Sequence, residues 1–409
     1  MRALSATRAA AIIAPVAAWL PAGQAHADPL VVQPLVDARL RYELVDQAGL
    51  TRDAEALTLR VRPAVLARTG AWSALVEGEA VIGFVGRYND GTNGRTPYPL
   101  VADPENVELN RAQISYSGSK GLALTAGRQR IELLDQRFVG SSGFRQSEQT
   151  FDAVRVRWGT PKGLSVDISY AWSDRTINGV NGRGARQQAV SGNNVFALAG
   201  YGTALGMLTG FAYLVDQDEA AVQSYRLSSQ TYGVRLAGGV PLGSGARLAY
   251  AASWARQSDW HRNPNRYSAD YWLAEGVVTS HSLAVSAGYE ILGADNGLPL
   301  TSVQTPLASL FKWQGWADRF TTTPPNGLRD LYAGAAYGLK AARATAISLS
   351  GTWHRFDSDR AIQHYGDEVD LLASAKRGRH TVSARYARYR ADAFATDTDK
   401  FWLSLEWSL

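Results

Sequence analysis

Apolar and polar residues alternate along most of the chain after residue 30. Between residues 32 and 44 every second residue is apolar, and the residues between them include Asp37, Arg39, Arg41 and Glu43. A period of two is typical of a β-strand with one apolar and one polar face. This segment is longer than the roughly 5–6 residues of a common strand, and it exceeds the about 9–11 residues that a tilted strand needs to cross a bilayer.

The same alternation predicts 18 strands in all. They lie near residues 32–44, 57–65, 72–84, 107–117, 121–132, 151–158, 164–176, 194–201, 205–216, 229–240, 246–257, 268–279, 282–292, 328–339, 345–356, 368–376, 380–389 and 400–409. An even number of strands is typical of single-chain barrels of the bacterial outer membrane. After Leu20 the chain has no apolar run that approaches the length of a spanning helix.

Short and long connections separate these segments. Short ones lie at 69–70, 118–120, 161–163, 202–204, 243–245 and 376–378, and long polar ones lie at 87–106, 133–150, 177–193, 259–267 and 293–327. Short turns at one end and long loops at the other are typical of a membrane barrel. We therefore predict an all-β fold: a transmembrane antiparallel β-barrel with long extracellular loops and short periplasmic turns.

The last strand supports a membrane barrel over a water-soluble β-sandwich or propeller. Residues 401–409 alternate between large apolar residues and the set Trp402, Ser404, Glu406 and Ser408. This segment resembles the C-terminal strand that outer-membrane barrels present to the barrel-assembly machinery, although Leu409 stands where such strands commonly have an aromatic residue. As the edge of a soluble sheet, it would invite aggregation.

The first residues predict export. Arg2 and Arg8 precede an apolar run that ends at Leu20, and Ala25-His26-Ala27 forms a small-residue cleavage site. This arrangement is typical of a secretory signal peptide; the alternative, a membrane anchor, needs a run of about 20 residues. We expect a signal peptide over residues 1–27 and a single barrel domain over residues 28–409.

Composition narrows the chemistry. The chain contains no cysteine, which excludes disulfides and thiolate metal sites. The net charge of +5 comes from 42 basic and 37 acidic residues, a balance too even for a nucleic-acid-binding protein. The 12 tryptophans, 18 tyrosines and 39 glycines fit the aromatic-rich strands of a membrane barrel.

Charged residues are expected to face the lumen, because a charge on the lipid side costs about 2–4 kcal/mol near the bilayer midplane. By parity, the basic lumenal set is Arg39, Arg41, Arg60, Arg62, Arg111, Arg155, Arg157, Arg235 and Arg385, and the acidic set is Asp37, Glu43, Glu77, Glu79, Asp167, Glu290, Glu368 and Asp370. Only six of the 42 basic residues are lysine. Arginine offers a rigid fork that matches a carboxylate, so these arginines either hold the wall together through ion pairs or pass an anionic solute along it.

Arg128 and Arg130 conflict with strict alternation. They share parity with Leu122, Leu124 and Ala126, which would direct both arginines toward lipid. Either Gly127 marks a bulge that shifts the register, or the two arginines lie beyond the hydrocarbon. We favour the bulge.

Catalytic and metal sites find little support. Motifs of serine hydrolases, phosphate loops and His-Glu-x-x-His zinc sites are missing from the sequence. His354 near Ser348 or Ser350 leaves a barrel enzyme as an alternative, but a hydrogen-bonded wall histidine is the simpler interpretation. The acidic loop residues, Asp357, Asp359, Asp392, Asp397 and Asp399, are interpreted as solvated rather than calcium-binding. We expect no enzymatic activity and no cofactor.

Two segments resemble the alginate-export family of outer-membrane channels. They are GRQRIELLDQRFVG with FRQSEQTFDAVRV, at residues 127–156, and GDEVDL at residues 366–371. The resemblance implies a monomeric 18-stranded barrel with an arginine-rich constriction for polyuronate. It also places Arg128, Arg130, Arg155, Glu368 and Asp370 in the matching motif positions.

The sequence thus predicts a passive channel in the bacterial outer membrane. Its partners would be outer-membrane lipid and an anionic saccharide, such as an alginate-like polyuronate, or another carboxylated solute. The residues expected to line the pore and bind substrate are Arg39, Arg41, Arg60, Arg62, Arg111, Arg128, Arg130, Arg155, Arg157, Glu368 and Asp370. The alternatives are a general or small-organic-acid porin and a barrel enzyme acting on lipid or saccharide.

Overall fold

Eighteen antiparallel strands follow one another along the chain in the computed structural model, which describes residues 28–160, 163–243, 245–341 and 345–409. The predicted signal peptide, residues 1–27, lies outside the described residues. The strands are β1 (Val31–Gln47), β2 (Ala54–Thr69), β3 (Trp72–Arg87), β4 (Asn106–Ser117), β5 (Ala123–Gln129), β6 (Thr150–Gly159), β7 (Leu164–Arg175), β8 (Ala189–Thr203), β9 (Gly206–Val215), β10 (Ser229–Gly243), β11 (Ala246–Asp259), β12 (Ser268–Ser280), β13 (Leu283–Leu292), β14 (Leu328–Ala341), β15 (Thr345–Asp357), β16 (His364–Arg377), β17 (His380–Ala391) and β18 (Thr398–Ser408).

Short 3-10 helices occur between some of the strands. They are η1 (Ser119–Gly121), η2 (Gln223–Tyr225) and η3 (Leu310–Lys312). Among the described residues, none of the helices has the length and apolar character needed to cross a membrane.

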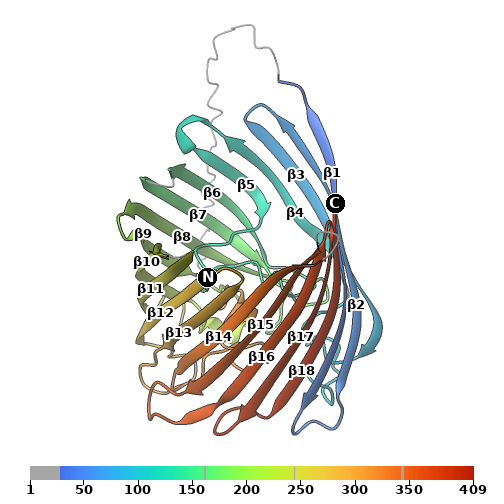
Figure 1. Cartoon of the computed structure of the whole chain (residues 1–409), viewed down its shortest axis with the longest axis vertical. Coiled ribbons are helices and arrows are strands. Elements are labelled where there is room, and N and C mark those ends of the chain that lie inside the picture. The colour runs from blue at the N-terminus through green and yellow to red at the C-terminus, as the bar shows by residue number, and fades with distance from the viewer. Residues whose placement is uncertain (1–27, 161–162, 244, 342–344) are drawn as a thin grey trace, which may run out of the picture.

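The sheet closes on itself (Figure 1). Each strand pairs with its neighbours in sequence, and β1 pairs with β18 from Asp37↔Ser408 to Gln47↔Thr398. In the part of the chain that the structure describes, closure leaves no strand at an open edge of the sheet. The predicted 18-stranded antiparallel barrel is confirmed, and the long loops all lie at the end opposite the short turns, because every connection reverses the chain direction.

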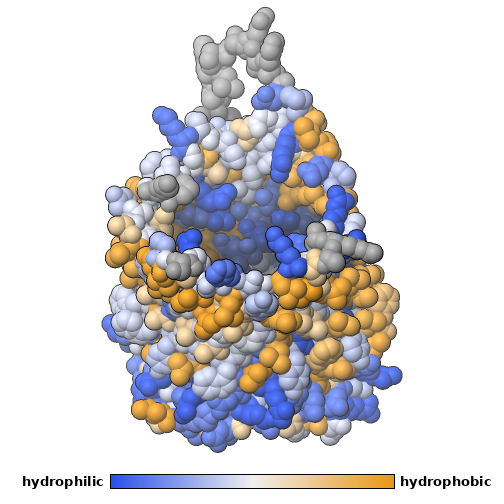
Figure 2. Space-filling view, viewed as in Figure 1, coloured by the Kyte–Doolittle hydropathy of each residue, from blue (hydrophilic) through white to orange (hydrophobic). Residues whose placement is uncertain are grey.

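The two faces of the wall follow the alternation of the sequence. On β1, Leu40 and Leu44 are 37% and 38% exposed, whereas Arg41 and Glu43 are each 1% exposed. Figure 2 shows the result: apolar residues gather on the outside of the barrel, and hydrophilic residues line the hollow mouth. This inverted distribution is the one that a hydrocarbon environment favours.

Strand β5 is shorter than predicted, whereas β2 and β8 are longer. The sequence predicted a strand over residues 121–132, but β5 ends at Gln129, and the chain then leaves the wall. Ile131 and Leu133 are apolar and therefore prolong the pattern, but both are buried in the interior of the molecule. The strand ends because these residues pack in the interior. The alternation of apolar and polar residues does not predict such packing.

Two of the long loops fold into the barrel. Residues 130–149, between β5 and β6, form the first inner loop, and residues 293–327, between β13 and β14, form the second inner loop. Their apolar side chains share one buried cluster with wall residues; the cluster includes Ile131, Leu133, Val139, Val303, Leu307 and Phe320 from the loops and Phe151, Phe196, Tyr213 and Trp402 from the strands. At this level the barrel is partly filled by its own loops.

Candidate functional site

The first inner loop crosses the lumen. Its Glu148 lies 3.2 Å from Arg62 on β2, and its Arg137 lies 2.6 Å from Glu290 on β13. On the shorter way around the ring, β1 and β14–β18 lie between these two strands. A loop that contacts both strands must therefore pass through the interior.

The two inner loops are bound to each other. The amide of Gly140 donates a hydrogen bond to the carbonyl of Leu307 (2.9 Å), and the amide of Ser309 donates one to the carbonyl of Gln136 (3.1 Å). Arg145 of the first loop forms an ion pair with Asp318 of the second (2.6 Å). The loops thus form one assembly inside the barrel.

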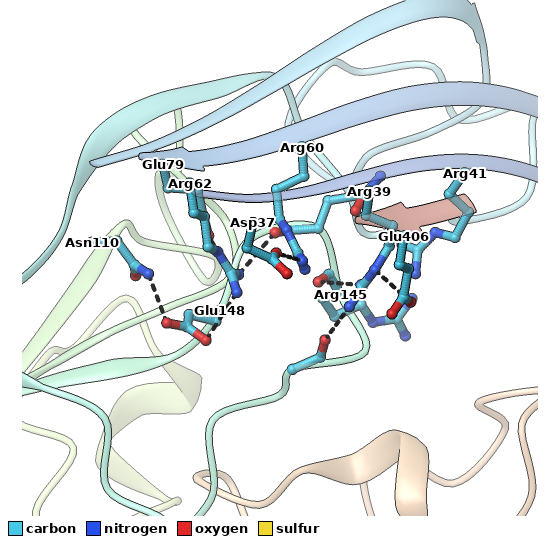
Figure 3. Close-up of polar contacts among 12 residues, drawn as sticks. Asp37, Arg39, Arg41, Arg60, Arg62, Glu79, Asn110, Arg145, Glu148 and Glu406 are labelled. Carbon is cyan, nitrogen blue, oxygen red and sulfur yellow. Dashed lines mark hydrogen bonds and ion pairs between the residues drawn. The ribbon is translucent and has the colours of Figure 1, made fainter. Parts of the chain in front are cut away.

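Four arginines of the neighbouring strands β1 and β2 face this assembly (Figure 3). Arg39, Arg41, Arg60 and Arg62 are all less than a tenth exposed. Arg39 and Arg60 are paired directly across the strands, an arrangement that destabilises a sheet unless other groups compensate the like charges. The compensating groups come from the first inner loop and from nearby acids.

Arg39 and Arg41 bind the backbone of the first inner loop. Arg39 donates hydrogen bonds to the carbonyls of Phe144 (2.7 Å) and Gly143 (3.0 Å), and Arg41 donates to the carbonyl of Phe144 (2.6 Å). Arg41 also forms an ion pair with Asp103. Burial opposes the ionisation of Asp103, but the charges of Arg41 and Arg145 outweigh it and lower the pKa of Asp103.

Glu148 binds a second group of side chains, two of which are cations. It accepts hydrogen bonds from Arg62 (3.2 Å), Arg130 (2.5 Å) and Asn110 (2.6 Å). Burial opposes its ionisation, but the charges of Arg62 and Arg130 outweigh burial and lower the pKa of Glu148. Arg62 also binds Glu79 (2.6 Å). Arg130 thus reaches the interior because the chain has already left strand β5, where alternation no longer applies.

Arg60 is less completely satisfied. Its Nη2 forms an ion pair with Asp37. Its Nε and Nη1 atoms are buried and make no hydrogen bond with any residue that the structure describes. An unmade hydrogen bond on a buried charged group is costly, so Arg60 is less favourably placed than the other three arginines of this group.

Arg128 corrects the sequence analysis. The pairing of β5 with β4 and β6 runs without a register shift through Gly127, so the predicted bulge is absent. Arg128 therefore lies on the same outward face as Val154, and it forms two hydrogen bonds with Asp152 (2.7 and 2.9 Å). Arg128 is one residue from the end of β5, and Asp152 neutralises its charge.

Gly127 itself has a different role from the predicted one. Its φ is +110°, and a side chain here would collide with the carbonyl oxygen of Ala112 on β4. Glycine is needed because the two backbones approach closely. The register stays in phase on both sides of it.

Three further predicted arginines lie on β4 and β6. Arg111 binds Glu77 (2.5 Å), and Arg155 forms two hydrogen bonds with Asp167 (2.8 and 2.5 Å). Arg157 is exposed and lines a cavity of about 540 Å³ between the wall and the tip of the first inner loop. Arg111 is linked to the Arg62 network, because Asn110 donates hydrogen bonds to both Glu77 (2.8 Å) and Glu148 (2.6 Å).

Glu368 and Asp370 hold the second inner loop. Glu368 accepts a hydrogen bond from the amide of Ala317 (2.7 Å), and Asp370 accepts one from the amide of Trp316 (3.2 Å). Both carboxylates are buried beneath the loop. Their wall position agrees with parity, but their partners are backbone amides about 50 residues away, which the sequence pattern does not reveal.

His354 is surrounded by acids. Its Nδ1 lies 2.9 Å from Asp330, and its Nε2 lies 3.8 Å from Asp370. Both contacts place the histidine in the wall network beside the second inner loop. The geometry matches the interpretation of a hydrogen-bonded wall residue.

A cavity of about 330 Å³, here called the arginine cavity, opens beside the bound loops. Four cations line it, Arg39, Arg41, Lys312 and Arg385, and Glu406 is the acidic residue of its lining. Glu406 lies 3.1 Å from Arg39. Its lining also includes the rings of Phe144, Phe311 and Trp316. The guanidinium of Arg385 lies 5.5 Å from the ring centre of Phe144 and 5.8 Å from that of Trp316.

Parity had placed Arg385 in the lumen but not in the predicted site. Lys312, Phe144, Phe311 and Trp316 were not predicted as site residues. They lie on loops, where alternation gives no direction for a side chain. Their only sequence signal is an aromatic or basic residue in a long polar loop, which many surface loops share.

A second cavity, of about 440 Å³ and here called the loop cavity, lies among the long loops. Its basic lining residues are Arg145, Arg186, Lys312, Arg319 and Lys400, and its acidic ones are Glu132 and Asp318. Asp318 accepts hydrogen bonds from Arg145 (2.6 Å) and Lys400 (3.0 Å). Burial opposes its ionisation, but the charges of these two cations hold the pKa of Asp318 well below its usual range.

Comparisons with known proteins agree with this architecture. The model of the alginate export family matches residues 35–177. No curated protein matches the chain.

Several solved structures share the fold. OccK9 (OpdG) of Pseudomonas aeruginosa is 16% identical, with 92% of this chain and 98% of that chain covered and a TM-score of 0.68. OpdK of Pseudomonas aeruginosa, solved with vanillate, is 13% identical, with 92% and 98% covered and a TM-score of 0.66. OccAB1 of Acinetobacter baumannii is 12% identical, with 92% and 96% covered and a TM-score of 0.68.

At these identities the solved structures support the fold alone. The family match covers the first third of the chain. The predicted resemblance is confirmed there, and it includes the segment 127–156 that first indicated it. The chain is therefore a bacterial outer-membrane β-barrel that resembles the alginate export family over residues 35–177.

Proposed function

We propose that this barrel is a passive channel whose arginine-lined lumen selects solutes that carry carboxylates. The observation that carries the proposal is the arginine cavity, where Arg39, Arg41, Arg385 and Lys312 face a single acid, Glu406. A guanidinium matches a carboxylate in two-point geometry. The bound loops already occupy some donors of Arg39 and Arg41, so a solute would be held weakly enough to leave again, as conduction requires.

The loop cavity offers a second binding site for an anion. It has five basic lining residues against two acids. Among the described residues, Arg186 takes part in no ion pair, so its charge is open to a solute. A carboxylate entering from the long loops would meet this cavity and then the arginine cavity, which supports transfer between weak sites.

Two solute classes fit this proposal. The family match favours an alginate-like polyuronate. The sizes of the two cavities, about 440 and 330 Å³, lie at the lower end of the roughly 300–1,000 Å³ found for small-molecule sites and favour small carboxylates. OpdK, which shares the fold, was solved with vanillate, a small carboxylate. We favour small carboxylated solutes, including single uronates, and keep the polyuronate as the second candidate.

The test is the reversal potential of the purified protein in a planar bilayer under a salt gradient. We expect anion preference in the wild type. The double variant Arg39→Ala and Arg385→Ala should reduce the anion-to-cation permeability ratio by at least threefold, because it removes two of the four cavity cations. Arg87→Ala, whose side chain is 72% exposed at the rim, is the matched control and should leave the ratio unchanged. Cation preference in the wild type would overturn the proposal.

The same bilayers separate the solute classes. Oligomeric uronate that blocks the current at micromolar concentration would favour the polyuronate. Current carried by benzoate or glucuronate without such a block would favour small carboxylates.

We propose that residues 1–27 form a cleaved signal peptide, that the barrel-assembly machinery inserts the protein, and that the barrel acts as a monomer without a cofactor or enzymatic activity. Mass spectrometry of the N terminus and of the intact protein in detergent would test the first and the third points.

A further inference from the structure

We propose that Phe144 and Phe311 form an aromatic constriction that separates the loop cavity from the arginine cavity and limits the cross-section of the solutes that pass. The inference rests on the proposed channel function and names the residues that decide which carboxylated solutes are admitted. Phe144 belongs to the first inner loop and Phe311 to the second.

The two rings close against each other and against the wall. Their centroids lie 3.2 Å apart and their planes differ by 2°. Each ring also meets Trp402 edge-on, with centroid distances of 5.8 Å for Phe144 and 5.7 Å for Phe311. Trp402 lies on β18 and is fully buried. Aromatic groups therefore extend continuously from the barrel wall to the middle of the two loops.

The two cavities meet at this pair. Both are lined by Gly143, Phe144, Phe311 and Lys312, and their other lining residues differ. Strand β18 shows that the cavities follow each other along the barrel. Lys400 lines the loop cavity and Ser404 lines the arginine cavity, and at about 3.4 Å per residue they lie about 14 Å apart. Trp402, which contacts both phenylalanines, lies between them.

The constriction is expected to open by rotation of side chains, not by movement of loops. The backbones on both sides of the rings are joined by the Gly140–Leu307 and Ser309–Gln136 hydrogen bonds. The ion pair between Arg145 and Asp318 joins them again. Neither phenylalanine is fully buried, so each ring has room to turn while the backbone stays in place. Shortening one side chain should therefore be enough to widen the passage.

The absence of cysteine from the sequence allows single thiols to report access. Thr321→Cys places a thiol in the loop cavity and Glu406→Cys places one in the arginine cavity. The probe is an anionic, membrane-impermeant methanethiosulfonate added from the extracellular side. We expect Thr321→Cys to react at least tenfold faster than Glu406→Cys. The same probe added from the periplasmic side should label Glu406→Cys rapidly, which shows that the thiol itself is reactive.

Removing the rings should abolish this difference. Phe144→Ala with Phe311→Ala should raise the extracellular labelling rate of Glu406→Cys at least tenfold and leave that of Thr321→Cys unchanged. Phe84→Ala, which removes a ring that is 60% exposed on the outer face, is the matched control and should change neither rate. If the double variant does not fold, either single variant serves, because the stack needs both rings. Equal labelling of Thr321→Cys and Glu406→Cys in the presence of both rings would overturn the constriction.

Flux through proteoliposomes tests the limit on solute size. Removing both rings should raise the flux of glucuronate relative to acetate at least threefold, and an unchanged ratio would overturn the role in selection. The labelling test compares the same anionic probe with and without the rings, and the flux test compares two monovalent anions, so neither ratio requires the wild type to prefer anions. A cation-preferring wild type would contradict the proposed function, whereas the labelling result would still decide the constriction.

Discussion

Asp318 illustrates how a single residue stabilises the inner loops. Its carboxylate is shared by Arg145 and Lys400, and the exposed fractions of these side chains are 9%, 11% and 2%. Removing one partner from a buried ion pair typically costs about 3–5 kcal/mol, because the remaining charge stays buried without compensation. In Asp318→Asn, two buried cations would face each other without their common anion.

We predict that Asp318→Asn lowers the free energy of unfolding by about 3 kcal/mol at pH 7, seen as a lower unfolding midpoint in detergent and faster proteolysis of the second inner loop. Asp270→Asn is the matched control, because Asp270 and its partner Arg256 are 38% and 60% exposed. A surface pair of this kind contributes about 0–1 kcal/mol.

The pKa of Asp318 gives this effect a pH dependence. The pKa is lower in the folded protein than the about 3.9 of an unfolded chain. The ion pairs therefore contribute their full stability above about pH 4 and lose it as the pH falls further. The difference in the free energy of unfolding between the wild type and Asp318→Asn should be the same at pH 7 and pH 5 and should become smaller below pH 4. A difference that already becomes smaller between pH 7 and pH 5 would contradict this assignment.

At the scale of elements, the first inner loop depends on its contact with the far wall. Arg137 and Glu290 lie 2.6 Å apart and are each 1% exposed. Arg137 also donates a hydrogen bond to Thr305 of the second inner loop (2.9 Å). The residue thus joins both loops to β13.

We predict that Arg137→Ala releases the first inner loop from β13 and increases the mean conductance and its noise in single-channel recordings. The variant should also lower the free energy of unfolding by about 3–5 kcal/mol, because Glu290 stays buried without its partner. Arg355→Ala, which breaks a half-exposed pair with Asp357, should leave the conductance unchanged. A quiet channel of wild-type conductance in Arg137→Ala would show that other contacts suffice to hold the loop.

The difference between strands and loops explains how much the sequence could predict. The strand faces follow from a local period of two, so the inward positions of Arg39, Arg41, Arg60 and Arg62 were predictable. The inner loops depend on pairs such as Arg137 with Glu290, which are 153 residues apart. Neither partner carries a local signal of the other, so the filling of the lumen and the placement of Phe144 and Phe311 could not be predicted.

Arg128 marks the limit of the strand argument itself. Alternation correctly indicated its outward face, and the preference for a bulge came from the assumption that no arginine tolerates that face. The assumption fails near a strand end, where Asp152 supplies two hydrogen bonds to the guanidinium. The rule against charge on the lipid side depends on depth in the bilayer.

At the scale of the whole molecule, the barrel has an apolar exterior and a charged interior. Adjacent residues of the same type on β16 allow the two faces to be compared. Leu371 is 48% exposed on the outer face, and Leu372 is paired with Arg385 on the inner face.

We predict that Leu371→Arg destabilises the folded barrel in lipid vesicles by about 2–4 kcal/mol, because it places a charge in hydrocarbon near the middle of the strand. Leu372→Arg should have a smaller effect, since its side chain points into the polar lumen. Urea titration of tryptophan fluorescence in vesicles measures both. Equal losses of folding free energy in the two variants would contradict the assignment of Leu371 to the outer face and Leu372 to the inner face.

The seam between β1 and β18 has a consequence for assembly. Arg39 lies on the first strand and Glu406 on the last, and they are neighbours only because these strands pair. Lys400 of the loop cavity, Ser404 of the arginine cavity and Trp402, which contacts both phenylalanines, belong to the same final strand. The pairing of β1 with β18 therefore closes the barrel and completes the passage in the same step. An insertion intermediate that is still open along this seam would lack the full set of cavity charges. It would also lack the wall against which Phe144 and Phe311 pack.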